Sequence, residues 1–435
     1  AGDVEGALQC LGRPRNQGMP AGQGRGGADR YDWWRAAFLI GTVCMSLAGS
    51  PGGLPGQPEP AWARSSTTGS GQRVNKDPVS LLQLALPLEN LRGEKQVAVV
   101  RGLQADIEEV KANTLLRLYT TATSFSEDAV NVVNKRREAL LKPVPAASRA
   151  EAEAIVDKIV AELPKLSKAI ATGQNSAAGT IKDVDAESAA MASAEACQQY
   201  IGDLEELMVG ADYNAPVPAD VPANLPRLQG RATVEFKLVR GPDWTGKKYT
   251  IDAKLYDEAT VRVVADGWSA PISAGNFVDL VDRGFYNGMK IQRADGFIIQ
   301  TGDTGDADDH GFRPGPGEKV RRIPLEVAVA GKTQALYGET VDEARLVGAQ
   351  VKIPFQSDGT LSMARSEFDN DSASSQFFVF LFESDLTPAG KNFLDGRYGS
   401  FGYTLEGAPF WRQVAEGDII TSAKVVSGIE KLKRE

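Results

Sequence analysis

The chain has 435 residues, of which 42% are hydrophobic and 24% are charged, a balance that supports a packed core and excludes a wholly disordered protein. Its 48 basic and 57 acidic side chains give a net charge of −9, which argues against binding to nucleic acid or to an anionic membrane surface. With His310 as the single histidine, a Ser-His-Asp triad or a multi-histidine metal centre is not expected, and the sequence predicts neither a metal nor a cofactor.

Residues 1–63 have the composition of a targeting segment. They are rich in Gly, Pro and Arg, and the apolar run Ala36–Ala48 is too short to span a bilayer, which takes about 20 residues. Ala61-Trp62-Ala63 has the pattern of a cleavage site. The segment resembles a bipartite chloroplast transit peptide, which predicts import into the thylakoid lumen and a mature protein without a stable membrane span; a single membrane anchor is the alternative. Two of the three cysteines, Cys10 and Cys44, lie in it, and Cys197 is expected to be a buried apolar residue.

Residues 79–209 are predicted to form an antiparallel four-helix bundle. Apolar residues recur at three- and four-residue steps, and the connections between the periodic segments are short. Ser148 and Glu151 have the spacing of a capping box, and Pro164 predicts a kink or break. Leu81–Leu91 is predicted to be a separate short helix. The four helices are expected over about 103–118, 126–142, 148–173 and 184–209.

The repeated prolines of 210–228 predict an extended linker, after which the hydrophobic period changes to two. Residues 229–435 are therefore predicted to form a mainly-β domain, consistent with a closed barrel. The whole chain is then a multidomain α + β protein. The strands are expected at 232–239, 249–256 and 261–265, with helices at 273–283 and about 386–393.

Six motifs stand out in the C-terminal half: Pro271–Leu280, Gly284–Gly288, Gly296–Asp303, Leu361–Ala364, Ser375–Phe378 and Phe393–Gly396. In their residues and in their order they resemble the motifs of the cyclophilins. The resemblance implies an eight-stranded antiparallel barrel that catalyses cis/trans isomerisation of X–Pro bonds. Together with the predicted bundle and targeting segment, the chain resembles the thylakoid-lumen cyclophilins that carry a PsbQ-like bundle.

The resemblance implies a substrate site that holds proline in an apolar pocket. Arg293 would donate a hydrogen bond to the proline nitrogen as the amide loses its conjugation, and Gln300 would bind the peptide backbone. Phe377 is expected to be barrel core. The pocket and its walls would be formed by Phe297, Ile298, Ala364, Phe378, Phe393, Leu394 and Tyr398.

Several positions depart from the family pattern. Arg293 is one residue closer to Gly296-Phe297 than in the family, and an alignment without a gap puts Gln292 in its place. Asp295 replaces a proline. Arg365, Phe393 and Tyr398 stand where the family has Asn, Trp and His. We therefore expect catalysis to be weak or suppressed.

The sequence leaves two functions open. The first is a lumenal peptidyl-prolyl isomerase and folding factor that acts on proline-containing segments and supports photosystem II assembly and repair. The second is a catalytically degenerate cyclophilin that acts as a non-enzymatic assembly chaperone. In both cases the resemblance implies photosystem II subunits as partners, and an intramolecular contact between bundle and barrel is compatible with either.

Overall fold

The computed structural model describes residues 74–434, apart from 245, 306–309 and 382–391. The predicted targeting segment 1–63 lies outside the described residues, as does most of the helix expected at about 386–393. Within the described ranges, no helix has both the length and the apolarity that a membrane crossing requires.

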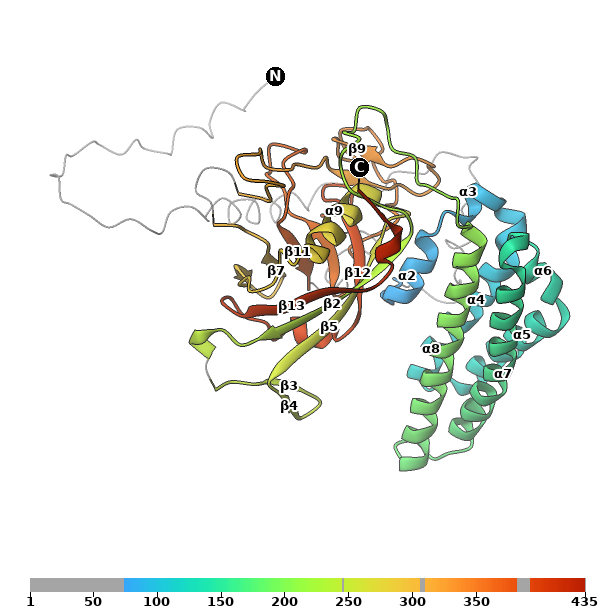
Figure 1. Ribbon diagram of the computed structural model, residues 1–435. Helices are drawn as coiled ribbons and strands as arrows, with labels where there is room; N and C mark the ends of the chain where they lie inside the picture. The colour runs from blue at the N-terminus through green and yellow to red at the C-terminus, as the bar shows by residue number, and fades with distance from the viewer. Residues whose placement is uncertain (1–73, 245, 306–309, 382–391, 435) are drawn as a thin grey trace, which may run out of the picture. The chain divides into compact units, whose positions relative to one another are not determined.

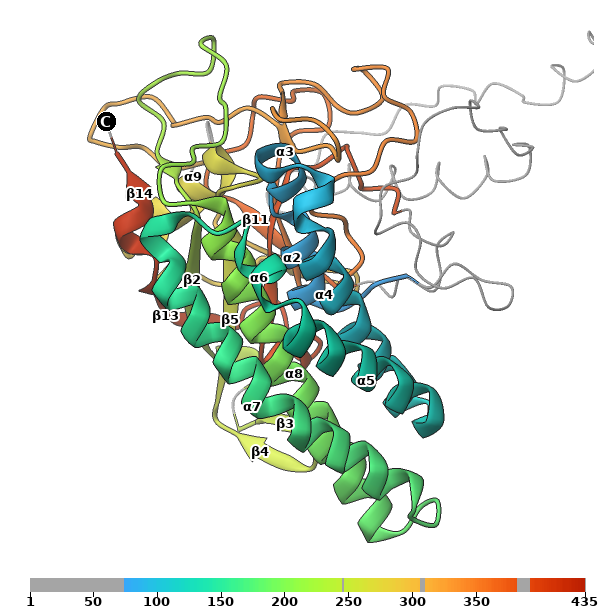
Figure 2. The ribbon, with the colours of Figure 1, turned by 90° about the vertical axis from the view of Figure 1, so that its right-hand side faces the viewer.

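Four long helices form the N-terminal bundle, as predicted, and each packs against its neighbours (Figure 2). Their apolar faces enclose one core, in which Leu103, Ile159 and Cys197 are completely buried. The long helices are α4 (Glu94–Leu115), α5 (Tyr119–Lys135), α7 (Arg149–Gln174) and α8 (Ile181–Val209), and the short ones are α2 (Pro78–Ala85), α3 (Leu88–Arg92), α6 (Arg137–Leu141) and the 3₁₀ turn Ala146–Ser148.

The helix ends differ from the predictions. The second long helix begins at Tyr119, seven residues before the predicted start at Ser126, and the Tyr119 hydroxyl donates to the buried Asp183. Ser148 precedes α7 without a side-chain capping bond, because it belongs to a 3₁₀ turn, so the predicted capping box is wrong. The break considered at Pro164 is also wrong. The helix α7 continues through it, with Leu163 and Leu166 buried on either side.

The C-terminal half contains an eight-stranded antiparallel sheet with the strand order β13-β2-β5-β12-β10-β11-β7-β6. Figure 1 shows β13, β2 and β5 side by side in this sheet. The segment before β6 closes the barrel, because Gly288 N–H donates to the Ile420 carbonyl and Ile420 N–H to the Met289 carbonyl. The sheet strands are β2 (Arg231–Val239), β5 (Glu258–Asp266), β6 (Arg293–Ala294), β7 (Ile298–Thr301), β10 (Thr360–Met363), β11 (Phe377–Phe380), β12 (Ser400–Glu406) and β13 (Ile419–Ser427).

Further short elements surround the barrel. The strand expected at 249–256 is a hairpin, because Asp252 and Ala253 both adopt positive φ angles and turn the chain. The helix α9 (Pro271–Asp282) packs on the barrel, close to the predicted range. The remaining elements are β1 (Arg227–Leu228), β3 (Tyr249–Ile251), β4 (Lys254–Tyr256), β8 (Glu326–Val327), β9 (Leu336–Tyr337), β14 (Leu432–Lys433), α10 (Ala408–Trp411) and the 3₁₀ turns Pro242–Trp244 and Ile429–Lys431.

The segment between bundle and barrel is irregular but packed. Val221, Leu225 and Leu228 are buried in the barrel core, and β1 pairs with β14. The helix α2 also contacts the barrel, because its Leu81, Leu82 and Ala85 share an apolar cluster with barrel residues. In addition, Arg231 on β2 donates a hydrogen bond to the Leu82 carbonyl. The barrel-side members of that cluster are Val264, Ile353 and Tyr403.

Candidate functional site

Three predicted site residues lie in one row across neighbouring strands. Arg293 on β6 is the direct cross-strand partner of Gln300 on β7, and Gln300 is the partner of Phe378 on β11. Directly opposed residues of antiparallel strands share a face of the sheet. Arg293 therefore lies beside Gln300, while the Gln292 side chain turns to the Asp303 carbonyl. The hairpin between β6 and β7 is thus one residue shorter than the family pattern, and this shortening is what brings Arg293, rather than Gln292, opposite Gln300.

The apolar part of the site is a compact cluster next to this row. Phe378 is at its centre, with the Tyr398 ring edge-on at 5.6 Å and the Phe355 ring parallel to it at 6.0 Å. Phe377 faces the opposite side, in the barrel core, as predicted. We call these residues the pocket cluster: Ile298, Phe355, Ala364, Phe378 and Phe380, with Leu394 and Tyr398 packed against them.

Two of the predicted apolar residues lie outside the pocket cluster, and two members of the cluster were not predicted. Phe297 and Phe393 are 42% and 50% exposed and lie outside the cluster. Phe355 and Phe380 belong to it but were not predicted. Phe355 lies in the irregular segment between β9 and β10, where the sequence has no periodicity to mark a core residue. Phe380 could have been found from its alternation with Phe378 along β11.

Asp295 fixes the candidate catalytic arginine. Its carboxylate accepts hydrogen bonds from the backbone N–H groups of Phe297 and Ile298, both at 3.0 Å, and from Arg293 Nε at 2.7 Å and Arg293 Nη2. Burial alone would raise the pKa of Asp295, but the two N–H groups and the ion pair with Arg293 outweigh it, so the pKa lies below its usual value. The residue that replaces the family's proline therefore both caps the hairpin turn and orients the guanidinium.

Gln300 and Tyr398 complete the polar surroundings. Gln300 Nε2 donates to Gln376 Oε1 at 2.7 Å. The Arg365 guanidinium lies 5.0 Å from the centre of the Tyr398 ring. Burial raises the pKa of Tyr398 to about 12, with the charge of Glu367 adding to the shift and the charges of Arg365, Arg293 and Arg397 opposing it, so its hydroxyl is neutral at physiological pH.

A buried carboxyl group positions Phe355. Asp395 accepts hydrogen bonds from the backbone N–H groups of Phe355 at 2.8 Å and Asn392 at 3.0 Å, and Asn392 Nδ2 donates to the Phe355 carbonyl. Burial raises the pKa of Asp395 to about 6, although both N–H groups oppose this shift. The segment between β9 and β10 is thus linked by hydrogen bonds to the turn that carries Leu394.

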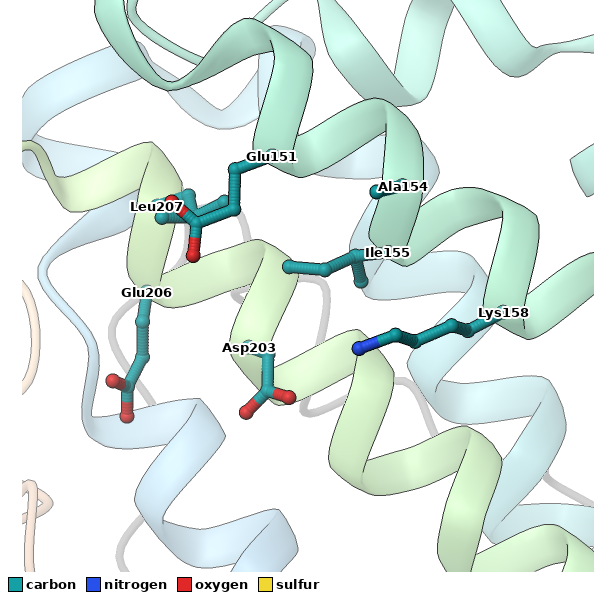
Figure 3. Close-up of a pocket in the computed structure, with 7 residues that line it drawn as sticks. All are labelled: Glu151, Ala154, Ile155, Lys158, Asp203, Glu206 and Leu207. Carbon is teal, nitrogen blue, oxygen red and sulfur yellow. The ribbon is translucent and has the colours of Figure 1, made fainter.

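A cavity of about 290 Å³ lies in the bundle between α7 and α8, and Figure 3 shows Lys158 extending toward Asp203 in it. Two of its charged residues already have partners, because Glu206 pairs with Arg231 and Lys158 lies 5.6 Å from the centre of the Tyr200 ring. The described residues include no group of three or more His, Cys, Asp or Glu side chains that could hold a metal ion. The barrel site is therefore the stronger candidate for function.

Comparisons with known proteins agree with the two halves of this fold. Residues 250–432 match the family of cyclophilin type peptidyl-prolyl cis-trans isomerases, and residues 77–209 match the PsbQ-like domain of CYP38-like peptidyl-prolyl cis-trans isomerases. The resemblance predicted from the motifs and from the bundle is thereby confirmed.

Relatives extend over most of the chain. It is 35% identical over 423 residues to the chloroplastic peptidyl-prolyl cis-trans isomerase CYP38 of Arabidopsis thaliana, covering 93% of this chain and 89% of that protein. It is also 35% identical over 357 residues to a putative thylakoid lumen peptidyl-prolyl cis-trans isomerase of Synechocystis, covering 82% and 84%. Arabidopsis CYP37, also chloroplastic, is 28% identical over 339 residues, covering 76% and 66%. These relatives confirm the predicted location in the chloroplast thylakoid lumen, and the chain belongs to the CYP38-like family of cyclophilin-type peptidyl-prolyl cis-trans isomerases.

Proposed function

We propose that the pocket cluster binds the proline ring of X–Pro segments and that Arg293 catalyses rotation about the preceding amide bond. The observation that supports this most is the row of Arg293, Gln300 and Phe378 on adjacent strands. It joins a cation, a backbone-binding amide and an aromatic floor on one face of the sheet.

The reaction requires little beyond such a row. Amide resonance sets the uncatalysed barrier at about 18–20 kcal/mol, and the twisted transition state places a lone pair on the proline nitrogen. A guanidinium N–H directed at that nitrogen binds the transition state more strongly than either planar ground state. Gln300 would hold the neighbouring peptide group, and no proton would be transferred.

Catalysis by Arg293 predicts a specific loss in the Arg293→Ala variant. Removing a charge-assisted hydrogen bond that strengthens in the transition state costs on the order of 2–4 kcal/mol, so the rate should fall about 30- to 1000-fold. Peptide affinity should change much less, because the pocket cluster remains. Exchange spectroscopy on an X–Pro peptide with the full chain measures both quantities.

Arg293→Lys is the matched variant for this test, since it keeps the charge but loses the planar fork, and it should lie between wild type and Arg293→Ala. Equal rates for wild type and Arg293→Ala, both above background, would remove Arg293 from the mechanism.

A non-enzymatic chaperone is the second candidate. Two observations favour it: Phe378 is only 3% exposed, and Asp295 already neutralises the Arg293 charge. In either role we propose photosystem II subunits as clients, with assembly and repair of that complex as the process served. An exchange rate at background for wild type, together with measurable binding to lumenal segments of those subunits, would favour the chaperone.

A further inference from the structure

Arg365 carries a positive charge that no carboxylate neutralises within the described parts of the chain. Its Nε and Nη2 groups donate to the Arg397 carbonyl at 3.1 and 2.8 Å, and its Nη1 group donates to the carbonyls of Ser366 at 2.8 Å and Glu367 at 3.3 Å. These contacts occupy four of its five N–H groups. Carbonyl dipoles hold the guanidinium in place but leave it with its full charge.

The neighbouring cations differ in this respect. Arg293 is paired with Asp295, and Arg397 lies 3.3 Å from Asp342. Glu343 is close enough for the Arg365 charge to contribute to the lowering of its pKa, but its carboxylate accepts hydrogen bonds from the Thr340 N–H and from Asn370. Of these three arginines, Arg365 is thus the one whose charge is left for a ligand.

The position of Arg365 relates this charge to the pocket. Arg365 directly follows Ala364 of the pocket cluster, and its guanidinium lies 5.0 Å from the Tyr398 ring, which in turn lies 5.6 Å from Phe378. The Tyr398 ring therefore lies between the Arg365 guanidinium and Phe378, the residue proposed to contact proline. A residue adjoining that proline in a bound peptide lies within reach of the guanidinium.

We propose that Arg365 is a specificity-determining residue that selects proline segments with an acidic residue adjacent to the proline. This inference rests on the proposed function of the pocket cluster. An incoming carboxylate meets a guanidinium that is already oriented, so little side-chain entropy is lost on binding. A lysine in the same peptide position would be repelled.

The net charge of the whole chain does not cancel this preference. At physiological ionic strength, charges more than about 8 Å apart are largely screened, so a bound side chain responds to the nearest guanidinium rather than to the overall charge of −9. The preference should accordingly weaken as salt is added.

The experiment compares three peptides that differ only in the residue before proline, Glu, Gln or Lys, with a second set varied after proline. Their dissociation constants for the full chain are measured by NMR titration at low salt. We expect Glu to bind about 10-fold more tightly than Lys in at least one set, with Gln between them. The Glu advantage over Gln should vanish on acidification through the peptide carboxyl pKa of about 4.3.

Variants assign the preference to Arg365. Arg365→Glu should reverse the order of the Glu and Lys peptides, Arg365→Gln should abolish it, and Arg365→Lys should keep it. Arg397→Gln is the matched control, because it removes a nearby cation that is already paired, and it should leave the order unchanged.

The outcomes separate the two proposals. If wild type binds all the peptides with equal affinity, or Arg365→Glu keeps the order of wild type while still folded, the role of Arg365 is wrong and the proposed pocket stands. If the chain binds none of the peptides, the proposed function fails and this inference fails with it.

Discussion

Phe355 lies parallel to Phe378, with 4° between the ring planes, and is 1% exposed. Truncating a buried aromatic side chain to alanine costs about 3–5 kcal/mol, because it removes apolar burial and leaves a cavity. We therefore expect Phe355→Ala to lower the free energy of unfolding by about this amount and to weaken X–Pro peptide binding, since Phe378 loses its support. Denaturant unfolding and peptide titration measure the two effects.

The control for that variant is Phe368→Ala. Phe368 is 93% exposed on the segment that follows Arg365, so its truncation should change stability by less than about 0.5 kcal/mol. Equal destabilisation by both variants would contradict the role given to Phe355.

Residue types and motif order are sufficient to predict most of the candidate site from the sequence, but not its geometry. The sequence allows either Gln292 or Arg293 in the row, because strand register depends on the length of a turn that no pattern specifies. Asp295, which looks like the loss of a family proline, is the group that makes the shorter turn work. Phe355 could not be predicted, because its burial depends on contacts with residues distant in the sequence.

The carboxyl group of Asp106, on α4, is partly buried and lies close to Asp128 on α5, so its charged form is unfavourable. Burial, with the nearby charge of Asp128, raises the pKa of Asp106 to about 7. The folded protein therefore holds this proton more tightly than the unfolded chain. The contribution of the protonated Asp106 to the free energy of unfolding is fully present below about pH 4, and it is lost as the pH rises through about 7.

Asp106→Asn keeps this position neutral at every pH. We expect it to raise the free energy of unfolding at pH 8 by about 1–2 kcal/mol, after allowance for partial solvent exposure, and by much less at pH 4.5. Denaturant unfolding at both pH values tests this, with the exposed Glu127→Gln on α5 as the control. A pH-independent gain would show that charge is not the cause.

The sequence predicts the long helices of the bundle, but not where each of them begins and ends. The apolar periodicity predicted all four long helices, because burying one face decides whether a helix forms. Their ends depend on local hydrogen bonds, such as the one from Tyr119 to Asp183, that periodicity does not encode. Pro164 lies within α7 because its buried neighbours outweigh one lost backbone hydrogen bond.

The proline-rich segment 210–228 joins the two halves of the chain, and three of its apolar side chains pack into the barrel core. Val221, Leu225 and Leu228 are 6%, 4% and 0% exposed. Burial of an aliphatic side chain stabilises by about 1.5–3 kcal/mol. A fragment comprising residues 210–435 should therefore melt at a higher temperature than one comprising 229–435. Coincident melting would mean that the segment acts as the linker that its composition predicts.

Intermolecular nuclear Overhauser effects locate the bound proline, which we propose lies at the pocket cluster beside Arg293. The measurement uses the full chain with labelled aromatic rings and an X–Pro peptide. We predict contacts from the proline ring protons to the rings of Phe378 and Tyr398, and their retention in Arg293→Ala, whose rate should be reduced. Proline contacts confined to the bundle, or to the exposed Phe393 without Phe378, would show that proline does not bind at the pocket cluster.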